Sequence, residues 1–276
     1  MLKELTGIWS YTFMVRALVV GSLISVCAAL LGVNLVLKRY SMIGDGLSHV
    51  GCGAMAIAVC IGWAPLWVAM PVVIVASFLL LGIRRNKRMQ GDAAIGLISS
   101  GALAIGVMAV SVTKGINIDL NSYMFGSILS LSQSDLVLSI LLSVFVLLGY
   151  ILLFPRIFAV TFDDAFAAAT GTKVELYNAA ISVFTAVTIV LGMRMMGTLL
   201  ISSLILFPAL TSMRLGRRFR SVVIIAALVS LLCFWAGLLL SYLAGTPAGA
   251  SVVCANMLAF AMAQIIRTMR NAAARH

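Results

Sequence analysis

Long runs of apolar residues dominate the chain, and short polar segments separate them. Most runs are about 20 residues long, which is the length that an α-helix needs to cross the hydrocarbon core of a bilayer. They show no alternation with period two, so the strands of an outer-membrane barrel are not expected. The pattern predicts nine transmembrane helices, at approximately residues 14–37, 42–62, 64–83, 93–113, 135–154, 176–193, 197–213, 221–243 and 250–266.

Two places complicate this count. Residues 114–134 are half apolar but are broken by glycine and polar residues, which predicts an interfacial or re-entrant piece rather than a span. The link at 194–196 is very short. If two half-length helices meet there, the number of full spans changes.

Composition places the whole chain in the membrane. It is 63% hydrophobic and 10% charged, with a mean hydropathy of +1.16, whereas soluble domains carry about 25% charged residues. We therefore expect a single all-α polytopic transmembrane domain over residues 1–276. The segment after Arg16 lacks a small-residue cleavage site, so it is expected to remain as the first span rather than to be removed as a signal peptide.

The position of the basic residues explains the net charge of +11. Loops rich in lysine and arginine face the cytoplasm, which predicts an inner-membrane protein with its N-terminus outside and its C-terminus inside. Fifteen of the 19 basic residues then lie on the cytoplasmic side, so a nucleic-acid partner is not expected. They are Lys38, Arg39, Arg84, Arg85, Lys87, Arg88, Arg156, Lys173, Arg214, Arg217, Arg218, Arg220, Arg267, Arg270 and Arg275.

Residues 161–171 carry the signals of a short cytoplasmic helix. Thr161 and Asp164 form a variant of the capping box, and Asp163 and Asp164 suit the positive end of a helix dipole. Four alanines follow, and Gly171 fits a helix stop. At about 15 Å the helix is too short to cross a bilayer.

Asp45 and His49 are the clearest candidates for chemistry. They lie four residues apart in an apolar segment, a spacing that puts both side chains on one face of a helix. A carboxylate and an imidazole are ordinary ligands of Zn²⁺, Mn²⁺ and Fe²⁺, and ionisable groups inside a bilayer are usually functional. Two other interpretations stay open: a buried hydrogen-bonded pair between helices, or, for Asp45, a carboxylate at a helix start.

The cysteines add one further candidate ligand. None forms a CxxC pair and all lie in apolar segments, so disulfides are not expected. Cys52 lies one turn beyond His49 and could add a soft ligand; otherwise it is small apolar filler, as the other four are expected to be. The five are Cys27, Cys52, Cys60, Cys233 and Cys254.

Several enzyme motifs are absent. The sequence contains no Gly-x-x-x-x-Gly-Lys-Ser/Thr and no His-Glu-x-x-His, so hydrolysis of ATP by this chain is not expected. His49 is the only histidine besides His276, which argues against a closed four-ligand zinc site. A transient site with two or three ligands suits a transporter, because a metal that is bound too tightly is not released.

Four stretches resemble the permease subunits of the ABC-3 family of zinc, manganese and iron ABC importers. They occur in the family's order over most of the chain, and together they are more specific than any one alone. They are Gly44-Asp45-Gly46-Leu47-Ser48-His49; Asp92-Ala93-Ala94-Ile95-Gly96-Leu97 with Ala102-Leu103-Ala104-Ile105-Gly106-Val107; Ser122-Tyr123-Met124-Phe125-Gly126-Ser127-Ile128-Leu129; and Gly197-Thr198-Leu199-Leu200-Ile201-Ser202-Ser203 with Phe207-Pro208-Ala209.

The resemblance implies a homodimeric permease with two cytoplasmic ATP-binding cassette ATPase subunits and an extracytoplasmic metal-binding protein. ATP hydrolysis on the partner would switch the pore by alternating access. Asp45 would supply an oxygen ligand and His49 a nitrogen ligand for the transported ion, with no permanently bound cofactor. The residues that match the family's coupling segment, and are expected to couple the permease to the ATPase, are Asp163, Asp164, Ala167 and Gly171.

The chain departs from the family at two positions. After His49 the family often continues Ala-Val-Leu-Pro-Gly, whereas this chain has Val50-Gly51-Cys52-Gly53. The usual proline kink is missing and a thiol is present, which puts the local helix shape and the metal preference in doubt. Asp164 stands where Glu is common. Zinc, manganese and iron all stay open, and a pore-facing Cys52 would favour zinc.

Three methionines near the predicted outer mouth are candidates for a gate. Met193, Met195 and Met196 are flexible and apolar, so they could seal a pore without binding hard ions. Ordinary packing at the membrane interface, with a snorkelling Arg194, is the simpler interpretation.

Other functions are compatible with the same residues. A proton-coupled metal carrier or channel would use Asp45 and His49 as a proton relay and would need no ATPase. A siderophore or cobalamin permease of the ABC class would not need the pair, and an intramembrane protease would need Asp45 together with Asp92. For a metal importer, we expect uptake to fall below about pH 6.5, because only a neutral imidazole binds a metal.

Overall fold

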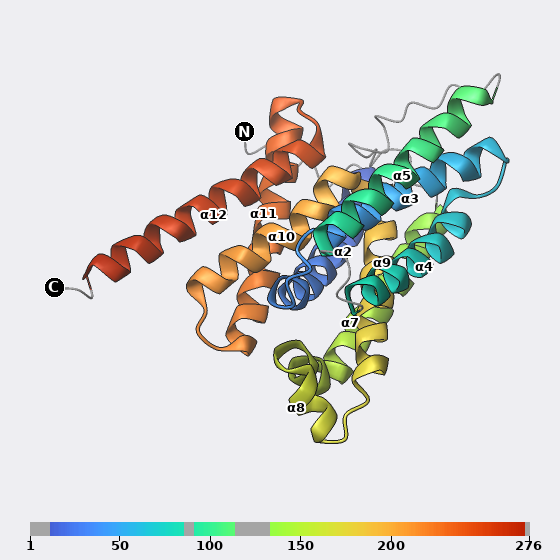
Figure 1. Cartoon of the computed structure of the whole chain (residues 1–276). Helices are drawn as coiled ribbons and strands as arrows, with labels where there is room; N and C mark the ends of the chain where they lie inside the picture. The colour runs from blue at the N-terminus through green and yellow to red at the C-terminus, as the bar shows by residue number, and fades with distance from the viewer. Residues whose placement is uncertain (1–11, 86–90, 114–132, 274–276) are drawn as a thin grey trace.

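The apolar runs form helices that pass up and down through one bundle (Figure 1). The computed structural model describes residues 12–85, 91–113 and 133–273, so the predicted interfacial stretch at 114–134 lies almost entirely outside the described residues. The helices are α2 (Thr12–Leu37), α3 (Ile43–Cys60), α4 (Pro65–Arg85), α5 (Gly91–Val112), α7 (Gln133–Phe162), α8 (Asp164–Ala169), α9 (Val174–Met196), α10 (Thr198–Leu215), α11 (Phe219–Ala244) and α12 (Ala248–Ala273).

The predicted all-α architecture is confirmed, and the number of long helices agrees approximately with the predicted nine. In the described part of the chain, eight helices are long and apolar enough to cross a membrane, and the apolar stretch of α4, Pro65–Leu80, is shorter. Helix α4 nevertheless continues to Arg85. It packs against α3 and α9, so it runs through the bundle like its neighbours.

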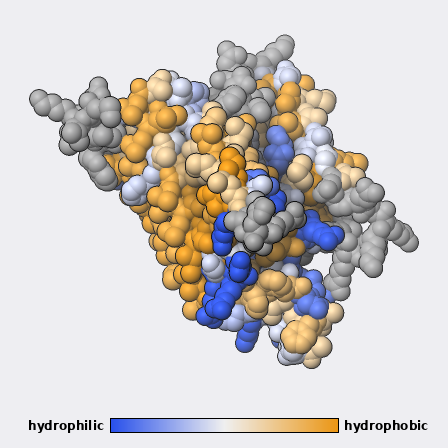
Figure 2. Space-filling view, turned by 90° about the vertical axis from the view of Figure 1, so that its left-hand side faces the viewer, coloured by the Kyte–Doolittle hydropathy of each residue, from blue (hydrophilic) through white to orange (hydrophobic). Residues whose placement is uncertain are grey.

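The short helix α8 marks one end of the bundle, which we call the α8 end. Helices α2 and α7 finish there, and α3 and α9 begin there (Figure 1). Asp45 lies in the first turn of α3, so it is close to this end. Figure 2 shows that apolar residues cover most of one face of the molecule, while hydrophilic residues gather mainly in its lower half.

The structure corrects the predicted end of the fifth span. Helix α7 does not stop near residue 154 but continues through Pro155 to Phe162, because membrane-type helices tolerate proline. Thr161 therefore lies inside α7, where its hydroxyl donates to the carbonyl of Ile157, and it does not cap the short helix. Asp163 is the cap instead, because its side chain accepts hydrogen bonds from the first backbone N–H groups of α8.

The short link near residues 194–196 does not divide a span. Helix α9 is continuous to Met196, and Gly197 alone joins it to α10. Gly197 has φ +87° and ψ 164°, a backbone conformation that is essentially restricted to glycine. The hairpin therefore depends on this residue.

Candidate metal-transport site

Helix α3 carries both predicted metal ligands, and close contacts with α5 fix its position. A Cβ atom on Gly53 would lie 2.3 Å from the carbonyl oxygen of Ala102. A Cβ atom on Gly106 would lie 2.6 Å from the Cα of Gly53. The two backbones touch because both positions lack a side chain. On its other sides α3 packs against α4, α9 and α10, so the site is built on a firmly held helix.

Asp45 and His49 lie on one face of α3, as their spacing predicted. His49 Nε2 and Asp45 Oδ2 are 3.7 Å apart, and the two side chains are 26% and 51% exposed, respectively. This separation is too long for a hydrogen bond. Two donor atoms that share one ion lie at most about 4.2 Å apart, because each is about 2.1 Å from the metal. The pair is therefore spaced to bind one ion together, and in the single chain it is not a buried hydrogen-bonded pair.

One chain alone offers few further ligands. In the described residues, no group of three or more His, Cys, Asp or Glu side chains comes together. Cys52 is on the same helix but is only 1% exposed, whereas Asp45 is half exposed. The Ser48 hydroxyl donates to the backbone carbonyl of Asp45. The pair is thus open to its surroundings, and the role of Cys52 as a ligand stays a prediction.

The three methionines of the predicted outer gate are core residues in the single chain. Met193, Met195 and Met196 are 0%, 2% and 3% exposed. A Cβ atom on Gly51 would lie 2.6 Å from Cε of Met193, so this methionine packs on α3 two residues beyond His49. The contact brings the α9–α10 hairpin against the site helix. A gating role for these methionines stays a prediction.

The side chain of Arg194 forms an ion pair with a carboxylate, in addition to any snorkelling toward the membrane interface. Its guanidinium donates to Oδ2 of Asp135 at 2.7 Å, and the two side chains are 26% and 16% exposed. Asp135 lies in the first turn of α7. The ion pair therefore ties the end of α9 to the start of α7, at the end of the bundle opposite α8.

The predicted coupling segment forms a well-defined helical turn. Asp163 caps α8, and Ala167 is fully buried against residues of α7 and α9. Gly171 has φ +79°, and the N–H groups of Gly171 and Thr172 donate to the carbonyls of Ala168 and Ala167. This is a Schellman stop, as the glycine predicted. Asp164 remains 58% exposed and pairs with Lys38.

A buried polar group connects α2 to α7, and the sequence analysis did not identify it. The side-chain amide of Asn34 donates to the Tyr150 hydroxyl at 2.8 Å, and Thr161 donates to Asn34 Oδ1 at 3.1 Å. All three residues are buried. Asn34 carries a polar amide side chain within an apolar run, and polar groups inside a membrane usually have a role. This polar position in the sequence could have identified Asn34 as a candidate.

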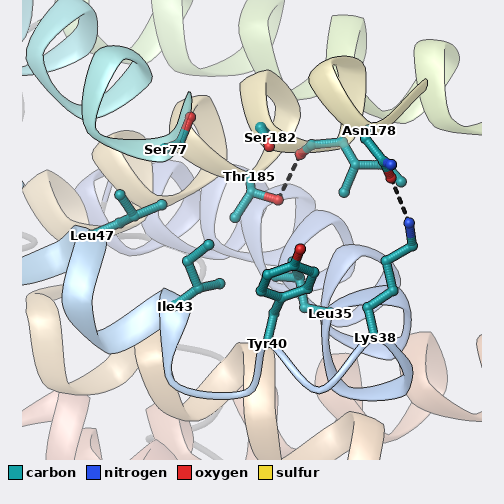
Figure 3. A pocket seen from close by; sticks show the side chains of 10 residues that line it. Leu35, Lys38, Tyr40, Ile43, Leu47, Ser77, Asn178, Ser182 and Thr185 are labelled. Atoms are coloured by element: carbon teal, nitrogen blue, oxygen red, sulfur yellow. Dashed lines mark hydrogen bonds between the residues drawn. The ribbon is translucent and has the colours of Figure 1, made fainter. Parts of the chain in front are cut away.

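Lys38 is a second residue that the sequence analysis considered only as a topology signal. It lies at the end of α2 and reaches Asp164 in α8 and Asn178 in α9. Figure 3 shows its side chain beside Tyr40 at the edge of a small hollow. The hollow lies between the start of α3 and the face of α9 that carries Ser182 and Thr185.

Three relatives similar in sequence carry the names of membrane proteins of metal transport or uptake systems. The chain is 28% identical to the manganese transport system membrane protein MntC of Halalkalibacterium halodurans, with 92% of this chain and 87% of that protein covered. It is 28% identical to the high-affinity zinc uptake system membrane protein ZnuB of Haemophilus influenzae, with 89% and 94% covered. It is 30% identical to a probable metal transport system membrane protein of Treponema pallidum, with 93% and 98% covered.

Solved structures agree with this similarity. A chain of PsaBC from Streptococcus pneumoniae, solved in complex with a Fab, superposes with a TM-score of 0.84 at 25% identity and 95% coverage of both chains. An inward-facing putative metal-chelate type ABC transporter gives a TM-score of 0.68 at 16% identity, with 91% of this chain and 85% of that chain covered. The second likeness shows the fold alone.

A family model matches nearly the whole chain. The match extends over residues 10–267 and is to the ABC 3 transport family, in agreement with the four stretches that carried the resemblance. It includes α3 with Asp45 and His49, the α8 segment and the α9–α10 hairpin. The chain belongs to the ABC 3 transport family and is a permease of the kind found in metal importers.

Proposed function

We propose that this chain is the membrane permease subunit of an ATP-driven importer that moves a divalent transition metal into the cytoplasm by alternating access. Relatives named for manganese and zinc transport support this metal class. Iron remains a third candidate, because a carboxylate and an imidazole suit all three ions.

The observation that carries the proposal is the geometry of Asp45 and His49. They are a carboxylate and an imidazole on one face of an apolar helix, 3.7 Å apart and open to solvent or to a second chain. Two ligands hold an ion weakly, which suits transport because the ion must be released. In the proposed mechanism both residues bind the ion transiently, and water or a second chain completes its coordination.

A second copy of the chain is the expected source of further ligands. Helix α5 packs on α3, and its opposite face is exposed along Leu97, Ala104 and Met108. In the described residues nothing lies within 4 Å of a Cβ atom added to Gly96. A homodimer that buries this face would bring two Asp45–His49 pairs toward each other.

The energy source is expected on partner subunits, because the chain has no nucleotide-binding motif. In the proposed orientation the N-terminus lies outside and the α8 end faces the cytoplasm of a bacterial inner membrane, since the sequence pattern predicts most basic residues on that side. Cytoplasmic ATPase subunits would dock at α8, and an extracytoplasmic metal-binding protein would deliver the ion at the opposite end. ATP-driven movement of α8 would then switch access to Asp45 and His49.

The test is metal uptake by proteoliposomes that contain the permease with its ATPase subunits and the metal-binding protein. Radioactive zinc, manganese and iron are supplied separately, with and without ATP. Asp45→Asn and His49→Ala are compared at matched protein amounts. The proposal expects uptake of at least one metal that requires ATP and falls about a hundredfold in both variants, because losing even a residue that supports a metal ligand costs up to about a hundredfold.

Conservative and neutral changes serve as controls. Asp45→Glu keeps a carboxylate and should retain part of the uptake, while Leu240→Ala, on the exposed side of α11, should leave it near wild type. Uptake driven by a proton gradient without ATP would instead support a proton-coupled carrier. Uptake of a metal chelate but not of free ions would support the larger-solute class, and uptake that is unchanged in both Asp45→Asn and His49→Ala would exclude this pair as the site.

A further inference from the structure

The α2–α3 turn, residues 38–42, forms a short physical link between α8 and the metal-ligand pair. At the end of α2, Lys38 Nζ donates to Oδ1 of Asp164 at 3.2 Å. Asp164 is the first residue of α8. The same Nζ donates to the side-chain oxygen of Asn178 in α9. Asp45 follows Lys38 by seven positions, so one turn separates a residue that contacts α8 from a residue that is proposed to bind the metal.

The turn is held together by its own backbone hydrogen bonds. The N–H groups of Arg39 and Tyr40 donate to the carbonyls of Val36 and Leu35, and the N–H of Ile43 donates to the carbonyl of Tyr40. Arg39 has φ +60°, a left-handed conformation that is uncommon for a residue with a side chain. These bonds make the end of α2 and the start of α3 one unit, so a displacement of Lys38 is carried to the first turn of α3.

A second contact fixes the same part of α2 to the segment that leads into α8. Asn34 lies one turn before Lys38 and forms hydrogen bonds with Tyr150 and Thr161 of α7. Thr161 is three residues before Asp164. The end of α2 is thus bound to the α7–α8 segment at two levels, one buried and one at the surface.

Burial distinguishes the roles of the two charged partners. The Lys38 side chain is 10% exposed, whereas the Asp164 side chain is 58% exposed. An ion pair with one partner so exposed contributes little to folding stability. A small hollow lies between the turn and α9 and is lined by Ile43, Leu47 and Ser182 among others (Figure 3). The contact is therefore better suited to position the turn than to hold the fold together.

We propose that Lys38 is a positioning residue for transport, which couples α8 to the helix that carries Asp45 and His49. When the ATPase displaces α8, Asp164 moves with it, and Lys38 transmits the movement through the α2–α3 turn to the metal pair. The inference rests on the proposed function, because it requires an ATPase that acts on α8. It assigns to Lys38 a role beyond that of a topology determinant.

The test measures ATP hydrolysed per metal ion taken up, in proteoliposomes with the ATPase subunits and with Mn²⁺ or Zn²⁺ as the probe. Lys38→Met should assemble with the ATPase and retain ATP hydrolysis, while the number of ATP molecules used per ion rises about tenfold, a typical size for coupling between sites. Asp164→Asn should act in the same direction. The double variant should be no worse than Lys38→Met alone, because Lys38→Met already breaks the contact that Asp164→Asn removes, together with the bond to Asn178.

Rescue and control variants separate coupling from a purely structural role. Lys38→Arg keeps the charge and should restore a ratio near wild type, and the exchanged pair Lys38→Glu with Asp164→Lys should recover part of it. Arg217→Met removes an exposed charge from the same end of the molecule and should change nothing. Fluorescence-detected metal binding in detergent should be unaltered in Lys38→Met.

If the wild-type protein transports normally, three outcomes would overturn the inference alone. The first is an unchanged number of ATP molecules per metal ion in Lys38→Met, and the second is loss of metal binding in that variant. The third is that the effects of Lys38→Met and Asp164→Asn multiply in the double variant. A wild-type protein that takes up no metal with ATP would overturn the proposed function, and the inference with it.

Discussion

Helices α3 and α5 touch through their backbones, yet they lie in opposite environments. The most apolar window of α3 is 72% buried in the bundle, whereas that of α5 is 22% buried. The more hydrophobic helix is the exposed one, because the mean hydropathy of the window is 1.4 for α3 and 2.1 for α5. In a water-soluble protein the more hydrophobic helix would be expected inside. In a membrane, lipid tails are as apolar as leucine, so hydrophobicity does not decide which apolar helix is buried in the bundle.

The difference shows what places a helix at the centre of this protein. Helix α3 carries glycines that allow neighbouring backbones to approach and polar side chains that need protein or water rather than lipid. Helix α5 contributes small residues to α3 on one face and presents an apolar face to its surroundings. Small and polar residues, rather than a higher hydropathy, distinguish the more buried helix from the more exposed one, and three experiments can test this contrast.

The largest effect is expected where the two helices touch. A side chain at Gly53 would collide with the backbone of Ala102, which cannot move aside as a flexible side chain can. Gly53→Val should therefore cost about 3 kcal/mol or abolish folding, at or beyond the upper range for overpacked cores. The measurement is the yield and the thermal unfolding of the purified chain in detergent.

The matched control is the same substitution on the exposed face of α5. Gly96→Val meets nothing within 4 Å in the described residues, so the purified single chain should unfold within about 0.5 kcal/mol of wild type. Equal destabilisation by both substitutions would contradict the contrast between the two helices.

A smaller effect is expected from the buried polar group on α2. Asn34→Leu removes the partner of the Tyr150 hydroxyl, which stays buried, whereas the Thr161 hydroxyl keeps its hydrogen bond to the carbonyl of Ile157. The cost should be about 1–3 kcal/mol, the penalty for a buried polar group without a partner. Combining Asn34→Leu with Tyr150→Phe should cost less than the sum of the two single changes, and a strictly additive result would show that the two side chains do not interact.

The smallest effect is expected on the exposed face of α5. Ala104→Trp places a large side chain where a second copy is proposed to dock, while the single chain should tolerate it. Dimerisation in detergent, followed by analytical ultracentrifugation, should weaken about tenfold, which corresponds to about 1.4 kcal/mol. An unchanged dimer would move the proposed interface away from α5.

Much of the fold could be predicted from the sequence, because apolar length alone selects helices that span a membrane. The approximate positions of the long helices and the family followed from this pattern and from the matched motifs. The stop at Gly171 followed from local chemistry. The end of α7 did not, because Pro155 and Thr161 resemble a helix end and a cap but lie within one continuous helix.

Contacts between distant segments could not be predicted. The spacing of Asp45 and His49 placed them on one face, but their 3.7 Å separation and their exposure depend on how α3 packs. Nothing in the sequence pairs Lys38 with Asp164 or Arg194 with Asp135. Nor could the hydropathy pattern show which of α3 and α5 lies inside the bundle, since both are long and apolar enough to cross a membrane.

The one-residue link at Gly197 limits how the protein can be altered. The residues on both sides of it, Met196 and Thr198, are buried, and the link has no spare length. An inserted epitope or protease site at this position would have to separate two packed helices rather than lengthen a surface loop. Labels and fusion partners are better placed at the exposed segment around Arg217, and a spectroscopic probe on α9 or α10 would report the movement of the whole hairpin.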